Sequence, residues 1–317
     1  MLDPKFSTYS NKAAKAMDDA INAPLARHTT LKIGGEADRL CQPHTKDELV
    51  ELIDGLNTKG EPWFILGGGS NLLVSSEGFR GTVIRTTNLL EITNPEPGVL
   101  VASAGARLPH IAKFAASLGL SGLEFAVGIP GTVGGGVIMN CGAHGSSMSN
   151  IFVSALVFDT TTNELKTMSK DDLAFEYRRC RLDPAKHVVV EARFKMEQGA
   201  REDIERKTKE NEEYRFRTQP IGTPNAGSTF KNPDPQRTAG FLLDKAGAKQ
   251  LQEGQAGVSS LHANFVVNLG GATSNQVTTL LRRMQDRVHE EFDVHLSPEW
   301  KILGHFTDSE KEVWKKS

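Results

Sequence analysis

Four segments of the chain carry the sequence features of helices. Three of them repeat apolar side chains every three or four positions, which predicts helices with one buried face: residues 45–60, 108–118 and 273–288. Thr45-x-x-Glu48 and Thr273-x-x-Gln276 form capping boxes at two of the starts, and Gly60 and Gly119 suit the ends of two helices. The fourth segment, 201–217, is dense in charge, so we expect a solvent-exposed connecting helix there.

Short runs of β-branched and aromatic residues lie between these helices. Gly, Pro or Asn bounds them, which predicts strands at residues 63–66, 82–85, 99–103, 151–159, 187–196, 264–268 and 295–303. Helices and strands interleave without a strict βαβ rhythm, so the predicted fold class is α+β. Residues 220–235 are rich in turn-forming residues and follow the charged helix, and we place a domain boundary near residue 200.

The composition fits a folded protein without a strong charge bias. The chain has 317 residues, which is enough for two domains at roughly 150 residues each. Its 37 basic and 39 acidic residues give a formal net charge of -2. Because no overall positive field would hold a nucleic-acid backbone or an anionic membrane, we expect neither as a partner.

Three further features bear on location and metal binding. The first twenty residues lack the apolar core of a secretory signal, which favours a cytoplasmic protein. Cys41, Cys141 and Cys180 lie far apart without a CxxC pair, so we expect neither a disulfide framework nor a metal site. Residues 125–158 contain no charged side chain, but Pro130 and the many glycines argue against a membrane span.

The first candidate binding loop is a glycine cluster that follows a predicted strand. Gly67, Gly68 and Gly69 come directly after residues 63–66, and consecutive glycines allow backbone N–H groups to form an anion-binding nest. The loop matches neither common nucleotide fingerprint, because Leu72 replaces the third glycine of G-x-G-x-x-G and no GK[ST] follows. From this loop alone, two interpretations are possible: a diphosphate-binding loop and a plain tight turn.

A second glycine cluster favours the binding interpretation. Residues 128–145 combine many glycines with no charged side chain. Each ordered glycine costs about 0.5–1 kcal/mol relative to alanine, so close approach of the backbone to a large ligand explains the run better than core packing does. Two such loops in one domain predict an extended ligand, with phosphates at the first and a flat ring system near the second. A flavin dinucleotide fits that description.

Five motifs together resemble a known family. They occur in the family's order and spacing: LGGGSNLL (66–73), GLEFAVGIPGTVGGGVIMNCGAHG (122–145), YRRCR (177–181), NAGSTFKNP (225–233) and LSPEWKILG (296–304). The chain is similar over about residues 22–304 to UDP-N-acetylenolpyruvoylglucosamine reductases, the MurB family. The short link between residue 181 and the strand at 187 resembles the branch that lacks an extra tyrosine-bearing loop.

The resemblance implies a fold and a domain division. We expect an FAD-binding domain of the vanillyl-alcohol oxidase (PCMH) type at residues 23–200, followed by a smaller α+β substrate-binding domain at residues 201–304. Residues 1–22 are then an N-terminal extension, and residues 305–317 a charged tail. The implied setting is the bacterial cytosol, in the synthesis of peptidoglycan precursors.

The resemblance also implies a reaction. Hydride passes from NADPH to non-covalently bound FAD, and then to the enolpyruvyl group of a UDP-sugar, the small-molecule substrate. Negative charge that develops beside the carboxylate requires a cation, a hydrogen-bonding group and a proton donor. By their match to the family these are Arg178, Glu299 and Ser228, respectively. Without the match to the family, Arg178 would be interpreted as part of a surface salt bridge, Glu299 as an exposed acid and Ser228 as a turn residue.

The match extends to residues that contact the cofactor and the substrate. For the cofactor it implies Leu66, Gly67, Gly68, Gly69, Ser70, Asn71, Leu72, Ile129, Pro130, Gly131, Thr132, Gly134, Gly135, Asn140 and Gly142. For the substrate we expect Tyr177, Arg215, Arg217, Lys231, Asn232 and Lys301, although Arg215 and Arg217 could also be ordinary solvated charges. The chain departs from frequent family residues at His144 (tyrosine), Cys180 (serine) and Lys301 (arginine).

The sequence is also compatible with two other functions. A related FAD oxidoreductase acting on another small substrate would keep both glycine loops, but it has no reason to keep Ser228, Lys231 and Glu299 together. A nucleotide-binding protein without catalysis has no need of those three residues either. The presence of all three therefore favours the reductase.

Overall fold

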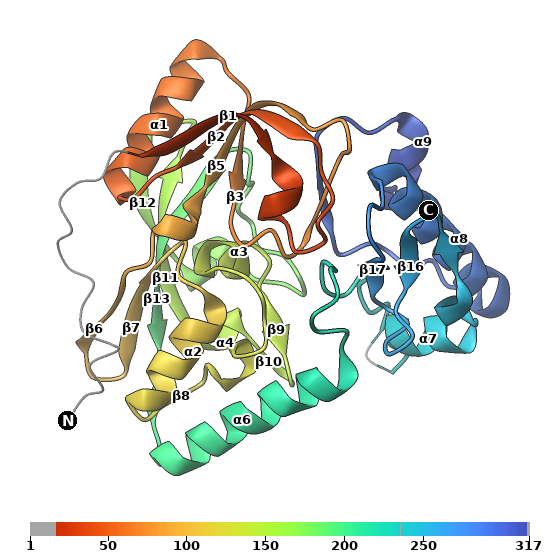
Figure 1. Ribbon diagram of the computed structural model, residues 1–317. Helices are drawn as coiled ribbons and strands as arrows, with labels where there is room; N and C mark the ends of the chain where they lie inside the picture. The colour runs from red at the N-terminus through yellow and green to blue at the C-terminus, as the bar shows by residue number, and fades with distance from the viewer. Residues whose placement is uncertain (1–16, 235, 316–317) are drawn as a thin grey trace.

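The computed structural model describes residues 17–234 and 236–315 (Figure 1). Most of the predicted N-terminal extension and the last two residues of the predicted tail lie outside the described residues. Residues 18–22 do not form an extension, because β1 (Asp18–Pro24) pairs antiparallel with β2 (Glu36–Gln42). Backbone pairing with β2 therefore makes these residues an edge of the first sheet.

The N-terminal half contains two larger sheets. The first has the order β1-β2-β5-β3, with β5 (Phe79–Arg85) and β3 (Trp63–Leu66) parallel to β2. The second is antiparallel with the order β12-β11-β13-β7-β6. Its strands are β12 (Glu164–Ser169), β11 (Phe152–Asp159), β13 (His187–Lys195), β7 (Val99–Ser103) and β6 (Ile92–Glu96).

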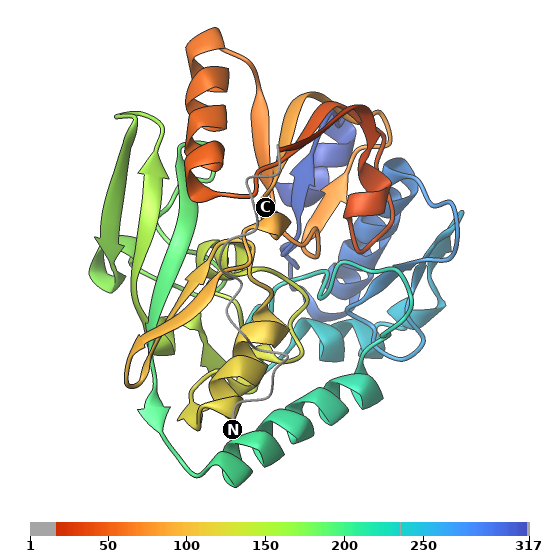
Figure 2. The same cartoon turned by 60° about the vertical axis from the view of Figure 1, so that its left-hand side comes forward.

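Helix α1 (Lys46–Lys59) packs between these two sheets. Leu49 and Ile53 are fully buried in a cluster with Ile84 of β5 and Phe158 of β11. The helix begins where the Thr45 side chain accepts a hydrogen bond from the Glu48 N–H, and it ends at Gly60 with φ 66°. Figure 2 shows α1, in orange, at the opposite end of the molecule from the long helix α6 (Arg201–Thr218).

Two helices cover the second sheet. Helix α2 (Leu108–Ser117) and the short α3 (Val133–Ile138) contribute to a core with Leu100, Ala102 and Phe194 of that sheet. The remaining elements of this half are small: β8 (Leu120–Ser121) pairs with β14 (Glu197–Gln198), β9 (Gly142–Ala143) with β10 (Ser146–Ser147), and α4 (Met148–Ile151) and α5 (Lys170–Leu173) are single turns. Helix α6 then leads to the C-terminal part (Figure 1).

The C-terminal part has its own core around α8 (Ser274–Phe292). Helix α7 (Ala239–Lys245) and the sheet of β15 (Gln252–Glu253), β16 (Ala256–Val258) and β17 (Val266–Asn268) pack on it. Leu31, Ile33 and Leu73 from the N-terminal half belong to the same core. In addition, β18 (Lys301–Leu303) pairs in parallel with β4 (Leu72–Val74), which follows the first glycine loop. The two halves are thus joined at the end of the chain.

The four predicted helices are confirmed, and the strands are confirmed with shifted ends. The strand predicted at 295–303 is wrong except for β18, because residues 295–300 place Pro298 in a single bridge to Phe230 instead of a ladder. The tail also differs from expectation. Residues 308–314 form α9 (Asp308–Lys311) and a 3-10 turn (Glu312–Trp314), and Val313 is buried in the C-terminal core.

Candidate active site

One large cavity lies where the two halves meet. Its volume is about 900 Å³, near the top of the roughly 300–1,000 Å³ that is usual for ligand pockets. Both glycine loops line it, together with Arg178 and the C-terminal segments around Ser228 and Glu299. All fifteen predicted cofactor residues except Asn140 line this cavity.

Close contacts within the protein require glycine at three positions of the first loop. A Cβ on Gly67 would lie 2.5 Å from the Thr132 Oγ1, and one on Gly68 would lie 3.3 Å from the Cα of Gly131. Gly69 has φ +63°, and a Cβ there would lie 2.2 Å from the carbonyl oxygen of His28. Gly67 and Gly68 therefore let the two glycine loops lie side by side, and both loops line the cavity.

The glycines of the second loop are of two kinds: some are packed against other protein atoms, and one faces the cavity. A Cβ on Gly134 would lie 3.1 Å from the Ala104 Cβ, and one on Gly136 would lie 3.1 Å from the Cys141 Sγ. Gly135 is exposed in the cavity, and the one protein atom near a Cβ there is the Thr132 Oγ1, at 3.8 Å. Packing among the described residues thus explains Gly134 and Gly136, whereas Gly135 leaves space for a ligand.

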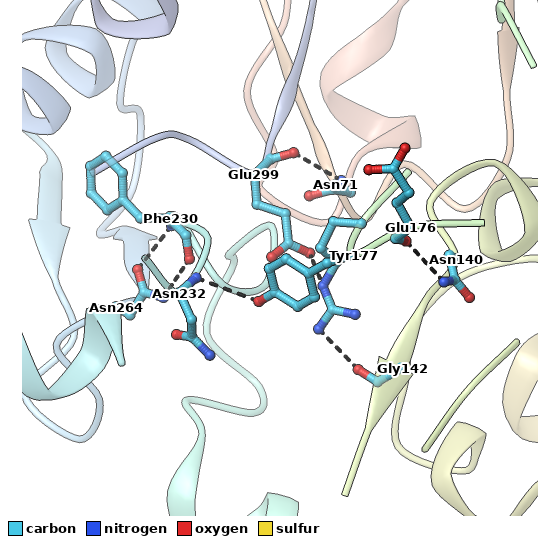
Figure 3. A network of polar contacts seen from close by, with 10 residues as sticks. Asn71, Asn140, Gly142, Glu176, Tyr177, Phe230, Asn232, Asn264 and Glu299 are labelled. Atoms are coloured by element: carbon cyan, nitrogen blue, oxygen red, sulfur yellow. Dashed lines mark hydrogen bonds and ion pairs between the residues drawn. The ribbon is translucent and has the colours of Figure 1, made fainter. Parts of the chain in front are cut away.

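The Asn140 side chain makes hydrogen bonds to the backbone at both ends of its amide. Its amide nitrogen donates to the Glu176 carbonyl at 2.9 Å, and its amide oxygen accepts from the Ser149 N–H at 3.0 Å (Figure 3). It is not among the described residues that line the cavity. Because both ends of the amide are engaged with the backbone, Asn140 holds the turn that carries Arg178.

Arg178 sits on a tight turn that directs its side chain into the cavity. Glu176 and Arg179 exchange backbone hydrogen bonds around the turn, and Arg178 has φ 58°. Its Nε lies 3.0 Å from the Glu299 Oε1, and its Nη2 donates to the Gly142 carbonyl at 3.0 Å. The guanidinium thus contacts the second glycine loop and the C-terminal part.

Glu299 is held by its backbone and buried at its carboxylate. Its N–H donates to the Thr229 carbonyl at 2.8 Å, and its carbonyl accepts from the Asn71 side chain at 3.3 Å. Burial raises the pKa of the Glu299 carboxyl, while Arg178 and Lys231 oppose that rise. A carboxyl in this setting can hold a proton at a higher pH than an exposed glutamate can.

Ser228 lies in the cavity on a firmly fixed loop. Thr229 beside it is fully buried, and its N–H donates to the Asn264 carbonyl at 2.9 Å. A Cβ on Gly227 would lie 3.7 Å from the Ser70 carbonyl oxygen, so this loop faces the first glycine loop. Among the described residues, the Ser228 hydroxyl has no protein hydrogen-bond partner, which leaves it available to a ligand.

The predicted substrate residues divide into two groups. Lys231, Arg215 and Lys301 line the cavity. Tyr177, Asn232 and Arg217 are not among the described lining residues. The Tyr177 hydroxyl accepts a hydrogen bond from the Asn232 N–H at 3.4 Å (Figure 3), and the Arg217 guanidinium lies 5.7 Å from the centre of the Tyr214 ring.

Arg215 and Gln219 provide polar groups on the α6 side of the cavity. Burial lowers the pKa of Arg215 to about 10, and within the described chain its side chain has no acidic partner. The Gln219 Oε1 is buried without a hydrogen-bond partner among the described residues. Sequence reasoning missed Gln219, as well as Trp300 and Trp314, which also line the cavity. Gln219 and Trp314 lie in no quoted motif, and Trp300 lies in LSPEWKILG without a role of its own there, because only the folded chain brings the three together.

Comparison with known proteins places this geometry in a family. Residues 219–303 match the C-terminal domain of UDP-N-acetylenolpyruvoylglucosamine reductase, and residues 37–168 match an FAD binding domain. A UDP-N-acetylenolpyruvoylglucosamine reductase from Caldanaerobacter subterraneus subsp. tengcongensis is 43% identical over 90% of this chain and 93% of its own length. The chain belongs to the UDP-N-acetylenolpyruvoylglucosamine reductase family. The reductase of Bacillus subtilis is 40% identical over 89% of this chain and 93% of its own.

A solved structure of the same family has a similar fold. The reductase (MurB) from Thermus caldophilus superimposes with a TM-score of 0.76 at 35% identity, covering 90% of this chain and 98% of that one. The expected α+β fold, with an FAD-binding part followed by a C-terminal part, is confirmed by these matches.

The cavity fits the FAD that this reductase family uses. At Gly135 a ligand can come close to the backbone, because there is no side chain in the way. In addition, the Thr132 Oγ1 is buried without a hydrogen-bond partner among the described residues. A buried hydroxyl of this kind is costly unless a ligand group satisfies it. Within the described ranges, no group of three or more His, Cys, Asp or Glu side chains could hold a metal ion. No helix in the same ranges is long and apolar enough to cross a bilayer.

Two of the three residues at which the chain is expected to depart from the family, His144 and Lys301, differ in their relation to the cavity. His144 makes an edge-to-face contact with Tyr214, with ring centres 5.4 Å apart, and so connects the second glycine loop to α6. Burial and the nearby Arg215 lower the pKa of His144, which favours its neutral form. Lys301 lines the cavity as the first residue of β18.

Proposed function

We propose that this chain reduces UDP-N-acetylenolpyruvoylglucosamine to UDP-N-acetylmuramate with NADPH and non-covalent FAD. The observation that carries the proposal is the convergence of both glycine loops, Ser228 and the Arg178–Glu299 pair on one cavity. The reaction supplies a peptidoglycan precursor, and we place it in the cytoplasm. The net charge of -2 supports a small-molecule substrate and no nucleic-acid partner.

The glycine loops would hold the FAD. Backbone N–H groups of residues 67–71 suit its diphosphate, and the open face at Gly135 suits its ring system. When bound, FAD supplies the hydride acceptor and donor that link NADPH to the substrate. The protein contributes orientation, exclusion of water and the handling of charge and protons.

Three side chains would act on the enolpyruvyl group. The Arg178 guanidinium binds its carboxylate and stabilises the negative charge that develops beside it. The Ser228 hydroxyl donates a proton to the carbon next to the carboxylate. A hydroxyl is a weak acid, but a carbon with carbanion character is a strong base, so correct position suffices. Glu299 adds a hydrogen bond that steadies the enolate form and orients Arg178.

The UDP part of the substrate would contact the basic residues farther along the cavity. Arg215 and Lys231 carry positive charge in the cavity, where an anion gains more from each contact than it does in water. Lys301 adds a third charge, but as an ammonium it lacks the planar fork of the arginine that is frequent in the family. In this proposal residues 23–200 bind mainly the cofactor, and residues 201–304 mainly the substrate.

The decisive experiment follows NADPH consumption by the purified, FAD-loaded protein. Addition of UDP-N-acetylenolpyruvoylglucosamine should start NADPH oxidation and yield one UDP-N-acetylmuramate for each NADPH. Phosphoenolpyruvate, which has the enolpyruvyl group without the UDP-sugar, is the control and should give no turnover. FAD-loaded protein that never consumes NADPH with the UDP-substrate would refute the proposal. Protein that cannot be loaded with FAD would refute it at an earlier step.

A further inference from the structure

Four backbone groups hold the segment that carries Glu299. The Glu299 N–H and carbonyl bond to Thr229 and Asn71, and the Lys301 N–H donates to the Asn71 carbonyl at 3.1 Å. The remaining group is the Trp300 carbonyl, which accepts a hydrogen bond from the Trp314 Nε1 at 3.0 Å. Trp314 lies beyond the residues 219–303 that match the family's C-terminal domain.

The tail that carries Trp314 is firmly attached to α8. Val313 is 2% exposed, and the Gln285 amide donates to its carbonyl at 3.0 Å and to the Leu296 carbonyl at 2.7 Å. The Trp314 ring lies 6.4 Å from that of Phe306, which is 1% exposed. In Figure 1 this C-terminal segment lies beside α8. The indole therefore has a defined position from which to hold the Trp300 carbonyl.

Trp314 also reaches the cavity itself. It lines the cavity together with Glu299, Trp300 and Lys301. The indole thus contacts the peptide that joins Trp300 to Lys301, one residue after Glu299. If this peptide rotates, the Glu299 side chain moves relative to Arg178 and Ser228.

We propose that Trp314 is a positioning residue for Glu299. The Trp314 N–H fixes the Trp300 carbonyl, and this keeps the Glu299 carboxylate at its place beside Arg178. The inference rests on the proposed function for its catalytic consequence, but the geometric part can be measured independently. A displacement of about 1 Å at a reacting group can reduce a rate by roughly 100-fold, so loss of a single hydrogen bond behind Glu299 is measurable.

Trp314→Phe removes the N–H while keeping an aromatic ring on Phe306. Trp63→Phe is the matched control, because the Trp63 Nε1 donates to the Asn57 Oδ1 at 2.7 Å and neither of these two residues is among the described lining residues. Both variants lose one indole hydrogen bond. With saturating UDP-substrate, Trp314→Phe should reoxidise the reduced flavin about 10-fold more slowly than the wild type. The substrate concentration that gives half of the maximal rate should change by no more than about twofold. Flavin content, flavin reduction by NADPH and the behaviour of Trp63→Phe should match the wild type.

Amide hydrogen exchange provides the readout that does not depend on activity. In Trp314→Phe, a peptide covering residues 299–303 should exchange faster, whereas peptides from α1 should not change. Equal loss in both half-reactions, or no change in reoxidation, would overturn the positioning role. Unchanged exchange at 299–303 would overturn it as well. If exchange responds as expected while the wild type shows no activity on the UDP-substrate, the proposed function fails and the contact of Trp314 with this segment stands.

Discussion

The Nε of Arg178 lies 3.0 Å from the Oε1 of Glu299, although the two residues come from different halves of the chain. Arg178 occupies a tight turn before β13, and Glu299 lies just before β18. The exposed fractions of the two side chains are 20% and 16%, so the pair is largely removed from water. A partly buried pair of this kind orients both groups, and the guanidinium still has N–H groups to offer to a carboxylate.

Arg178→Lys should weaken substrate use without loss of the cofactor. Lysine keeps the charge but loses the fork that can bind a carboxylate and the Gly142 carbonyl together. We expect reoxidation by the UDP-substrate to fall roughly 10- to 100-fold, as for the loss of about 1.5–3 kcal/mol from a hydrogen bond to a charged group. The control is Arg181→Lys, an exposed position in the same basic run. Stopped-flow flavin absorbance measures both variants, and equal effects would contradict the assignment.

Glu299→Gln should change the pH dependence of stability. Burial raises the folded-state pKa of Glu299 above its usual 4.5, so the folded protein holds this proton more tightly than the unfolded chain does. The resulting stabilisation is complete below pH 4.5 and is lost as the pH rises through the folded pKa. Glutamine is neutral throughout, so the melting temperature of the variant minus that of the wild type should increase from pH 4.5 upward and then level off. A difference that is independent of pH would show that burial does not raise this pKa.

The sequence predicted best those features that local residues determine. Thr45 and Gly60 set the ends of α1 through their own side chain and backbone, and both were recognisable as caps. β1 was missed because Asp18–Pro24 has no alternating apolar pattern and is held by pairing with β2. The pair of glycine loops led to the prediction of a ligand site, but their contact with each other, as between Gly68 and Gly131, follows from tertiary structure.

The candidate catalytic residues were within reach of the sequence only through family resemblance. Ser228 in isolation has the features of a turn residue, and its significance comes from the cavity formed by segments distant in sequence. Gln219 and Trp314 carry no motif at all. Their polar atoms acquire a role because folding buries one without a partner and directs the other to the Trp300 carbonyl.

Gly135→Val should prevent FAD binding and leave the fold intact. Gly135 has an ordinary helical backbone, and a Cβ there meets no protein atom closer than 3.8 Å, so the new side chain would mainly occupy ligand space. Gly55→Val is the matched control, because Gly55 is also a helical glycine, with nothing within 4 Å of its Cβ position. Flavin absorbance per protein after loading should fall to near zero in the first variant and remain normal in the second. Normal flavin in Gly135→Val would place the cofactor elsewhere.

Arg215→Met should stabilise the ligand-free protein and weaken substrate binding. Burial lowers the pKa of Arg215 to about 10. The buried charge therefore lowers the free energy of unfolding at every pH below that value, and this destabilisation decreases only as the pH rises through it. Methionine removes the charge and keeps methylene groups near Gly128. The melting temperature should rise roughly 2–4 °C for each kcal/mol recovered, equally at pH 6 and pH 9. Arg217→Met, at an exposed position, should change stability by no more than about 0.5 kcal/mol; a rise equal to that of Arg215→Met would exclude burial as the cause.

Ser228→Ala should separate the two half-reactions. Flavin reduction by NADPH requires no proton from the substrate side, so its rate should stay close to that of the wild type. Reoxidation by the UDP-substrate should fall by roughly 100- to 10,000-fold, the usual contribution of a positioned general acid. Ser260→Ala, at an exposed position of the C-terminal part, controls for the loss of a hydroxyl. Stopped-flow traces recorded separately for each half-reaction decide the matter. Equal slowing of both steps would mean that Ser228 supports the loop structure, and the proton would then have to come from another group in the cavity.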